Sequence, residues 1–460
     1  MFKLDLKIKE LLEILETYSV GVDGRTKNRK VNLCMDSRED AKGVVFWPIK
    51  GERFDAHQFV TQMEKNGALM SVVNQDAVGI ENFKMYAPVD DTTKALLKLA
   101  KGYQKNFKVK KVAITGSNGK TTTKEMVKSV LSTKFNTHAT AGNFNNHIGV
   151  PMTLFQLKHS HEAAVIEMGT SGPDEIRPLS MAVEPDLAVI TNIGASHLER
   201  LKDLDGVFAE KKTIVAGLKK NGVLIVNADD PRLCKCRSNT SYKVLTFGVK
   251  RGVIKPEKLA WTEDNCATFY VERTKFTLNV PGIHNLYNAL AAIAVGIQFK
   301  VPKTDIAKAL ANFRSTNMRM EIKNANGFKI VSDCYNANPS STKMALQTIG
   351  NMKVSRRIAI LGDMLELGAQ TDALHQEMGA LVPEMNFDML FTVGEKAKLY
   401  VKGAKAKGMK AACHFDSVDS LIDALTDVVA EGDVLLVKGS RGMHMEKVVD
   451  AMLRLTTVKA

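Results

Sequence analysis

Short, continuous apolar runs recur from residue 110 onward, and a helical pattern or a loop separates each run from the next. KKVAIT, AAVIEM, DLAVIT and GVLIVN are followed later in the chain by FKIVSD, RRIAILGD, FDMLFTVG and DVLLVKGS. A strand that is apolar at every position is covered on both faces, which is typical of a parallel sheet flanked by helices. The sequence therefore predicts two doubly wound α/β units.

The residues before these runs predict a different unit. Short strand-like runs, VVFWPI and ALMSVV, alternate with turns, and Leu4, Ile8, Leu11, Leu12 and Leu15 recur at the spacing of a helix. The length of 460 residues also fits about three domains at roughly 150 residues each. We expect a small α/β N-terminal domain (1–108), a central domain with a phosphate loop and a mostly parallel sheet (109–314), and a C-terminal Rossmann-like domain (315–460).

Composition narrows the class of partner. Apolar residues make up 45% and charged residues 25% of the chain, which are ordinary values for a folded globular protein. No apolar run is long enough to cross a bilayer, and the six cysteines lack metal-ligand spacing, so we expect a cytoplasmic protein with reduced cysteines and no stable membrane insertion. The net charge of +14 is spread along the chain without a nucleic-acid-binding signature. This favours anionic metabolites over nucleic acid as partners.

The strongest local signal is the segment TGSNGKTTT, Thr115 to Thr123, between a predicted strand and a predicted helix. Gly116 and Gly119 allow backbone amides to turn toward phosphate oxygens, Lys120 adds a positive charge, and the Thr121 hydroxyl can bind Mg²⁺. The spacing is GxxGKT, so the first glycine of the common P-loop pattern is replaced by Ile114. The alternative is a glycine-rich turn in which GKT occurs by chance.

Polar residues that end the apolar runs are the next candidates, because ligands of open parallel sheets bind beyond the carboxyl ends of the strands. Glu167 ends one run, Asn192 ends another, and His197 follows shortly after. Glu167 could bind Mg²⁺ through its carboxylate. Paired glycosidase carboxylates, HExxH, GxSxG and the kinase motifs HRD and DFG are all missing. Ligation, transport-like switching or nucleotide binding alone remain.

Several separate motifs resemble the Mur ligases, which join amino acids or peptides to a UDP-sugar precursor of the bacterial cell wall with ATP. The hallmark GxxGKT loop is met by Gly116 to Thr121, and the likeness covers nearly the whole chain. The motifs TAGNFNNHIGVPMTL (140–154), DCYNANPSS (333–341) and LGDMLELG (361–368) are most similar to those of the branch that adds D-alanyl-D-alanine. The DNPR-type signature of the diaminopimelate-adding branch is absent.

The resemblance implies an ATP and magnesium site. Residues Gly116, Ser117, Asn118, Gly119, Lys120, Thr121 and Thr122 would hold the phosphates, with Thr121, Glu167, His197 and a carbamoylated lysine around the metal. That lysine matches Lys211, although Lys212 is adjacent and Thr213 replaces the usual glutamate, so the choice between the two lysines stays open. Asn288 would contact the adenine, Arg319 the γ-phosphate, and Asp333 the nucleotide. Lys120, Lys211, His197, Arg319 and Asp333 form the implied catalytic set.

The resemblance also implies the substrates UDP-N-acetylmuramoyl-tripeptide and D-alanyl-D-alanine, joined by a monomeric enzyme through an acyl phosphate. The uridine diphosphate would bind to the first domain at the DSR and FDAH motifs. The implied substrate-binding residues are Ser37, Arg38, Phe54, Asp55 and His57 in the first domain, Asn143, Asn145 and Asn146 in the central domain, and Tyr335, Asn336 and Asn338 in the third.

Other interpretations remain open at the level of sequence. DSR could be a turn cap, Asn288 could serve helix packing, Arg319 could be a solvated linker charge, and YNANP could only start a helix at Pro339. The whole chain could be another Mur-type ligase, a folate or cyanophycin-type ligase, or a nucleotide-binding protein without activity. The residues do not identify the general base, nor whether the third residue of the acceptor peptide is lysine or diaminopimelate.

Overall fold

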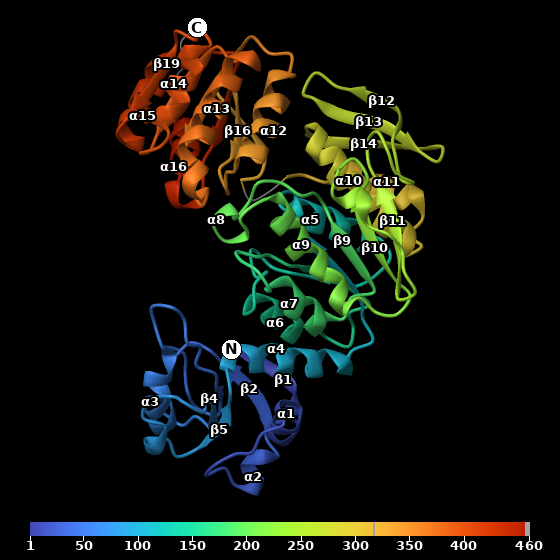
Figure 1. Cartoon of the computed structure of the whole chain (residues 1–460), viewed down its shortest axis with the longest axis vertical. Helices are drawn as coiled ribbons and strands as arrows, with labels where there is room; N and C mark the ends of the chain where they lie inside the picture. The colour runs from blue at the N-terminus through green and yellow to red at the C-terminus, as the bar shows by residue number, and fades with distance from the viewer. Residues whose placement is uncertain (316–317, 456–460) are drawn as a thin grey trace.

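A computed structural model of the protein describes residues 1–315 and 318–455. Figure 1 shows three bodies along the long axis, with the N-terminal domain at one end, the C-terminal domain at the other and the central domain between them. The predicted domain limits fall between helix α4 and strand β6 and just beyond helix α11. None of the described helices has the length and apolarity that a membrane-spanning helix needs.

The first domain holds a sheet of order β1-β2-β3-β4-β5, antiparallel between β1 and β2 and parallel elsewhere. Its strands are β1 (Phe2–Lys7), β2 (Lys30–Cys34), β3 (Val45–Phe46), β4 (Met70–Asn74) and β5 (Tyr86–Val89). Its helices are α1 (Ile8–Leu15), α2 (Gly24–Lys27), α3 (Val60–Lys65) and α4 (Thr92–Tyr103). Helix α4 packs on α1 and also on two helices of the central domain, so the apolar core continues across this boundary.

The helical prediction at the N-terminus is wrong for the first residues. Residues Phe2–Lys7 form strand β1, and the helix begins only at Ile8. Leu4 and Leu6 are buried while Lys3, Asp5 and Lys7 are exposed, which is the alternation of a strand with one covered face. Leu4 and Ile8 are four residues apart, a spacing that fits a helix as well as a strand. Residues Phe2–Lys7 form a strand because they pair with β2.

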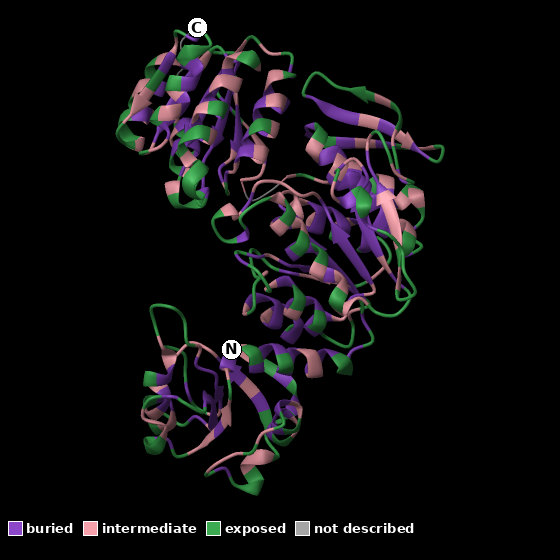
Figure 2. Ribbon diagram, in the orientation of Figure 1, coloured by how far each residue is buried: buried purple, intermediate pink, exposed green. Residues whose placement is uncertain are grey.

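The central domain is built on six parallel strands in the order β11-β10-β9-β6-β8-β7. They are β6 (Lys110–Thr115), β7 (Thr137–Ala139), β8 (Ala163–Glu167), β9 (Leu187–Ile190), β10 (Gly222–Asn227) and β11 (Tyr242–Phe247). The helices are α5 (Lys120–Leu131), α6 (Gly149–Phe155), α7 (Ile176–Val183), α8 (Leu198–Leu201), α9 (Leu204–Lys212), α10 (Ile283–Gln298) and α11 (Lys303–Asn312). The predicted parallel sheet is confirmed, and its strands β8 and β9 are buried at every position (Figure 2).

An antiparallel ribbon extends from this domain toward the third one (Figure 1). Its strands are β12 (Glu257–Trp261), β13 (Cys266–Val271) and β14 (Thr274–Pro281). The turn between β12 and β13 contacts the third domain: Asp264 lies 2.6 Å from the Lys329 ammonium, and the buried Asn265 donates to the Thr348 carbonyl at 3.0 Å. Through these two contacts the ribbon holds the third domain against the central one.

The third domain has a sheet of order β15-β16-β20-β17-β18-β19, parallel except for the β15–β16 pair. The strands are β15 (Glu321–Ala325), β16 (Phe328–Asp333), β17 (Arg356–Gly362), β18 (Met389–Val393), β19 (Ala412–Phe415) and β20 (Asp433–Lys438). The helices are α12 (Pro339–Gly350), α13 (Thr371–Glu384), α14 (Lys398–Ala406), α15 (Val418–Val428) and α16 (Glu446–Arg454). The predicted doubly wound α/β fold is confirmed here as well.

Candidate active site

The phosphate loop joins β6 to α5 with the backbone that the sequence predicts. Gly116 has a φ of +151° and Gly119 a φ of +78°. A Cβ atom on Gly116 would lie 1.9 Å from the Thr191 hydroxyl, and one on Gly119 would lie 2.4 Å from the Asn288 side-chain oxygen. Only glycine fits at these two positions. The Lys120 ammonium folds back over the loop and donates to the Gly116 carbonyl at 2.7 Å.

The end of strand β9 holds this loop in place. Asn192 accepts from the Asn118 amide at 3.0 Å and donates to the Asn118 carbonyl at the same distance. The Ser117 hydroxyl donates to the Gly194 carbonyl at 2.9 Å. Because β9 lies beside β6 in the sheet, the residues that follow it reach the loop directly.

Asn288 packs under the loop. Its side-chain oxygen accepts from the Thr123 hydroxyl at 3.1 Å, and its side-chain nitrogen donates to the Asn285 side-chain oxygen at 3.2 Å. The contact with Thr123 fastens α5 to α10, as the packing interpretation of the sequence expects, and the contact with Asn285 lies within α10. Contact with an adenine stays a prediction for this residue.

Glu167 ends strand β8 beside the loop and is almost fully buried. One carboxylate oxygen accepts from the Thr121 hydroxyl at 3.2 Å and from the Asn145 amide at 2.8 Å, whereas the other has no partner among the described residues. A buried carboxylate oxygen without a partner is costly unless a donor or a cation meets it. No group of three or more His, Cys, Asp and Glu in the described part of the chain could hold a metal by itself. Glu167 and Thr121 therefore fit a Mg²⁺ ion that is completed by phosphate oxygens and water.

The two adjacent lysines on α9 differ sharply in their surroundings. Lys211 is 1% exposed, whereas Lys212 is exposed with its ammonium over the Phe208 ring. Burial, together with the nearby charge of Lys120, lowers the pKa of Lys211 well below its usual value. Its neighbour Glu210 has a structural role, because its carboxylate accepts from the backbone amides of Asp174, Glu175 and Ile176. Lys211 is thus the lysine that the fold directs to the phosphate loop.

His197 lies just past β9 with a φ of +52°, and its Nδ1 atom is 2.8 Å from a carboxylate oxygen of Glu366 in the third domain. The His197 ring holds the pKa of Glu366 below its usual value. Glu366 belongs to the LGDMLELG motif, whose residues were not assigned a role from the sequence. The contact therefore joins the two domains at the edge of the site.

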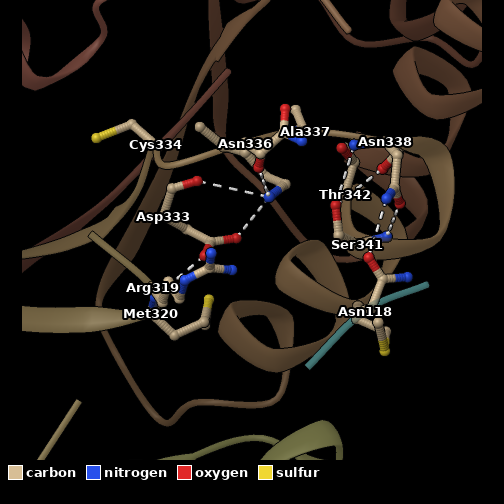
Figure 3. A network of polar contacts seen from close by, with 12 residues as sticks. Asn118, Arg319, Met320, Asp333, Cys334, Asn336, Ala337, Asn338, Ser341 and Thr342 are labelled. Carbon is tan, nitrogen blue, oxygen red and sulfur yellow. Dashed lines mark hydrogen bonds and ion pairs between the residues drawn. The ribbon is translucent and has the colours of Figure 1, made fainter. Parts of the chain in front are cut away.

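The third domain contributes a buried ion pair at the carboxyl ends of β16 and β20. The Lys438 ammonium is 2.6 Å from one oxygen of Asp333, and the Met320 amide donates to the other oxygen at 3.1 Å (Figure 3). The Arg319 guanidinium lies 3.9 Å from the centroid of the Tyr335 ring. The Nε atom of Arg319 has no partner within the described residues. Arg319 is held in place by stacking, which leaves donors free for an anion.

Asn338 connects the same segment to the phosphate loop. Its oxygen caps α12 by accepting from the Ser341 amide at 2.8 Å, and its nitrogen donates to the Asn118 side chain at 2.9 Å (Figure 3). Pro339 starts α12, as the sequence predicts. Asn336 accepts from Lys438 through its carbonyl at 3.0 Å.

These groups line a cavity of about 610 Å³ between the central and third domains. Most of the predicted residues of these two domains line it: Ser117, Asn118, Gly119, Lys120, Thr121, Thr122, Asn143, Asn145, Asn146, Glu167, His197, Asn288, Arg319, Asp333, Tyr335, Asn336 and Asn338. Gly116 and Lys211 are buried and are not among the residues that line the cavity.

Sequence reasoning missed several further cavity residues: Asn227, Asp229, Asp230, His284, Tyr287 and Lys438. Asn227 and Lys438 end strands β10 and β20, so the strand-end rule could have found them. Burial lowers the pKa of His284 to about 4, so its imidazole is neutral at physiological pH. Burial and the hydrogen bond to Asp229 raise the pKa of Tyr287.

The predicted first-domain residues lie outside this cavity. Arg38 is exposed and paired with Asp36, and Phe54 is exposed at 58%. Asp55 caps a short turn, and the buried His57 uses both ring nitrogens, one toward Asp55 at 2.6 Å and one accepting from the Asn74 amide at 3.0 Å. Ser37 adjoins Arg38 in the same turn and is partly buried. The fold thus offers Ser37, Arg38 and Phe54 to a ligand and locks His57 inside the domain.

Comparisons with known proteins show the family to which this chain belongs. The Mur ligase middle domain matches residues 114–296, and the Mur ligase glutamate ligase domain matches residues 318–441. UDP-N-acetylmuramoyl-tripeptide–D-alanyl-D-alanine ligase of Bacillus subtilis is 37% identical over 427 residues, which cover 92% of this chain and 93% of that one. The chain belongs to the family of these D-alanyl-D-alanine ligases, the MurF family.

Solved structures of MurF enzymes share the whole fold. MurF from Acinetobacter baumannii is 29% identical with a TM-score of 0.88, and the match covers 98% of this chain and 100% of that one. MurF from Thermotoga maritima in complex with ADP is 27% identical with a TM-score of 0.81, covering 92% of this chain and 97% of that one. The three-domain Mur ligase fold and ATP use, both predicted from the sequence, are confirmed.

Proposed function

We propose that this chain joins D-alanyl-D-alanine to UDP-N-acetylmuramoyl-tripeptide, with conversion of ATP to ADP and phosphate, in the synthesis of a peptidoglycan precursor. One observation carries the proposal: a glycine-fitted phosphate loop and a basic pair from another domain, Arg319 and Lys438, line a single cavity. The names of the MurF relatives supply the substrates, and the chain covers more than nine-tenths of the Bacillus subtilis enzyme.

The chemistry follows from the charges in the cavity. A carboxylate is a poor acyl donor, so it first takes the γ-phosphoryl group of ATP to form an acyl phosphate, and the amine of the dipeptide then displaces phosphate to form the amide. Lys120 and Arg319 lie where negative charge develops during phosphoryl transfer and stabilise it. Asp333 holds Lys438 in place through the 2.6 Å ion pair.

Thr121, Glu167 and His197 are the side chains that would hold Mg²⁺, with Lys211 in its carbamoylated form beside them. Magnesium supplies a charge clamp between two anionic reactants that otherwise repel each other. The lowered pKa of the buried Lys211 supports this assignment, because only an uncharged amine reacts with carbon dioxide to form a carbamate. Lys212, exposed over Phe208, has no such environment.

The substrate contacts are proposals of the same kind. The partly buried Ser37 and the exposed Arg38 and Phe54, supported by Asp55 and His57, would bind the uridine diphosphate. Asn143, Asn145 and Asn146 would contact the peptide, and Tyr335, Asn336 and Asn338 would contact the dipeptide. We further propose that the enzyme acts as a cytoplasmic monomer without nucleic acid, since ATP and both substrates are small molecules of that compartment.

Product analysis tests this function. The enzyme is incubated with ATP, Mg²⁺, bicarbonate and UDP-N-acetylmuramoyl-tripeptide, with and without D-alanyl-D-alanine, and the products are identified by mass spectrometry while phosphate is measured. The proposal predicts a UDP-linked pentapeptide that requires both substrates. A product with a single free amino acid would assign the chain to another ligase activity, and binding without turnover would assign it to the nucleotide-binding proteins.

A further inference from the structure

The loop that carries the LGDMLELG motif is built rigidly, although the ligation chemistry above does not use it. It follows β17 and includes Glu366, which contacts the cavity residue His197. The Asp363 carboxylate accepts from the Ala397 amide at 2.7 Å, the Met364 amide donates to the buried His375 ring at 3.0 Å, and the Leu365 amide donates to the Ser440 hydroxyl at 2.9 Å. Three separate elements of the third domain therefore fix the backbone immediately before Glu366.

His375 is itself locked by the opposite ring nitrogen. That nitrogen lies 2.7 Å from the Thr371 carbonyl, which can only accept, so it carries the proton and the other nitrogen accepts from Met364. The ring is fully buried. A neutral, fully engaged histidine is a fixed support for the loop.

The loop presents Glu366 to the central domain in an unfavourable backbone conformation. Glu366 has a φ of +63°, and its partner His197 has a φ of +52°. A left-handed conformation is unfavourable for a residue other than glycine and persists only where the surrounding structure enforces it. Glu366 and His197 meet at 2.8 Å across the domain boundary. Two strained residues from two domains thus converge on one contact.

The direction of the contact matters chemically. The Glu366 carboxylate lies 2.8 Å from Nδ1 of His197, so Nε2 is the ring nitrogen that it leaves for a cation. His197 also lines the cavity that contains Thr121 and Glu167. A histidine that binds a metal through one nitrogen is ordinarily oriented by a carboxylate on the other.

We propose that Glu366 is a positioning residue that orients His197 for the magnesium site, so that the central-domain metal site is complete only when the third domain is seated. This inference rests on the proposed function, in which His197 serves that site. The loop supplies Glu366 from the third domain, and Glu366 meets Nδ1 of His197, so that Nε2 would be the nitrogen that holds the metal. Through the contact between Glu366 and His197, binding of the cation would depend on the same domain interface that binds ATP.

Metal binding, measured without turnover, tests this role. Mn²⁺ is titrated into the full chain with a non-hydrolysable ATP analogue, and free Mn²⁺ is counted by electron paramagnetic resonance. Glu366→Ala should weaken Mn²⁺ binding about 10- to 100-fold, which is the usual effect of losing such a supporting carboxylate. Glu366→Gln should stay close to the wild type, because its amide oxygen still accepts from Nδ1. Glu377→Gln, an exposed change on α13, is the matched control and should have no effect.

A double variant separates orientation of His197 from loosening of the whole domain. In a His197→Ala background, Glu366→Ala should cause no further loss. A loss of equal size in that background would overturn the proposal, as would unchanged or tighter Mn²⁺ binding by Glu366→Ala alone. If Glu366→Ala does not fold, Glu366→Asp, which keeps the charge but falls short of the ring, should still weaken Mn²⁺ binding.

The test also distinguishes the inference from the function on which it rests. If the wild-type chain with the ATP analogue binds Mn²⁺ no better than the analogue alone, the magnesium assignment fails and the role of Glu366 fails with it. If the wild type binds Mn²⁺ and Glu366→Ala binds it equally well, only the role of Glu366 is refuted.

Discussion

Replacing Gly119 with alanine should inactivate the phosphate loop without unfolding the protein. Gly119 has a φ of +78°, a conformation that costs alanine roughly 1–2 kcal/mol. The added Cβ atom would also lie 2.4 Å from the Asn288 side-chain oxygen, so loop and side chain must separate by about 1 Å to reach ordinary contact distance. Asn288 cannot rotate away without losing its hydrogen bonds to Thr123 and Asn285. The phosphate loop must move instead.

A displacement of about 1 Å at a site that positions a reacting phosphate costs on the order of 10²-fold in rate. We therefore expect kcat/KM for ATP to fall about 100-fold in Gly119→Ala. Gly408→Ala is the matched control, because Gly408 has a φ of +85° but nothing within 4 Å of the added Cβ atom. This control shares the backbone strain and lacks the steric contact.

Kinetics and thermal unfolding of the two variants give the answer. Both should lose stability through the backbone strain, Gly119→Ala more because it adds the steric contact. Only Gly119→Ala should lose activity and affinity for a non-hydrolysable ATP analogue. Activity of Gly119→Ala within a few-fold of the wild type would refute the reasoning that the loop is pinned by Asn288.

Three further results are expected. Lys211→Arg should abolish ligation in a steady-state assay, whereas Lys212→Arg should keep most of it, because only Lys211 is buried with a lowered pKa. Equal losses of activity in the two variants would contradict the assignment of the carbamate to Lys211. Asp333→Ala should destabilise the third domain by about 3–5 kcal/mol, since it leaves the buried Lys438 ammonium unpaired. Amide hydrogen exchange in β16 and β20 should become faster. Unchanged exchange rates would show that water solvates Lys438 in the variant. Burial lowers the pKa of Lys111 from 10.5 to about 8, so the unfolded chain binds more protons between these values and stability should rise with pH across that window. In Lys111→Met this rise should disappear from chemical unfolding curves, and its persistence would locate the titration elsewhere.

Continuous apolar runs and the GxxGKT loop predicted the two large α/β domains because both signals are local. The apolar face of α5 at Met126, Val127, Val130 and Leu131 is buried as its spacing indicates. The strand at Phe2–Lys7 was mistaken for a helix because Leu4 and Ile8 fit both periods, and only pairing with β2 distinguishes them. The antiparallel ribbon β12–β14 was not predicted. Strand β12 is mostly exposed and has no alternation, but β14 does alternate, with Phe276, Leu278 and Val280 buried between polar residues.

The site was predictable where a residue ends a strand and less so where the domains meet. Glu167, Asn192 and Asp333 end strands or follow them directly, and all three line the cavity. Lys438 also ends a strand, β20, but was not predicted, because the motif at Asp333 was the only signal considered in this part of the site. Glu366 could not be assigned a role, because its partner His197 lies on another domain and only the assembled interface brings them together.

The central claim is that the cavity between the central and third domains activates a carboxylate by phosphorylation and then forms an amide. The most direct measurement uses UDP-N-acetylmuramoyl-tripeptide with ¹⁸O in the carboxylate that is ligated, together with ATP, D-alanyl-D-alanine and the wild-type chain. The account predicts that one ¹⁸O atom appears in the released phosphate for each pentapeptide formed, and that Lys120→Ala forms neither product. Label in AMP, or pentapeptide formed without transfer of ¹⁸O to phosphate, would contradict it.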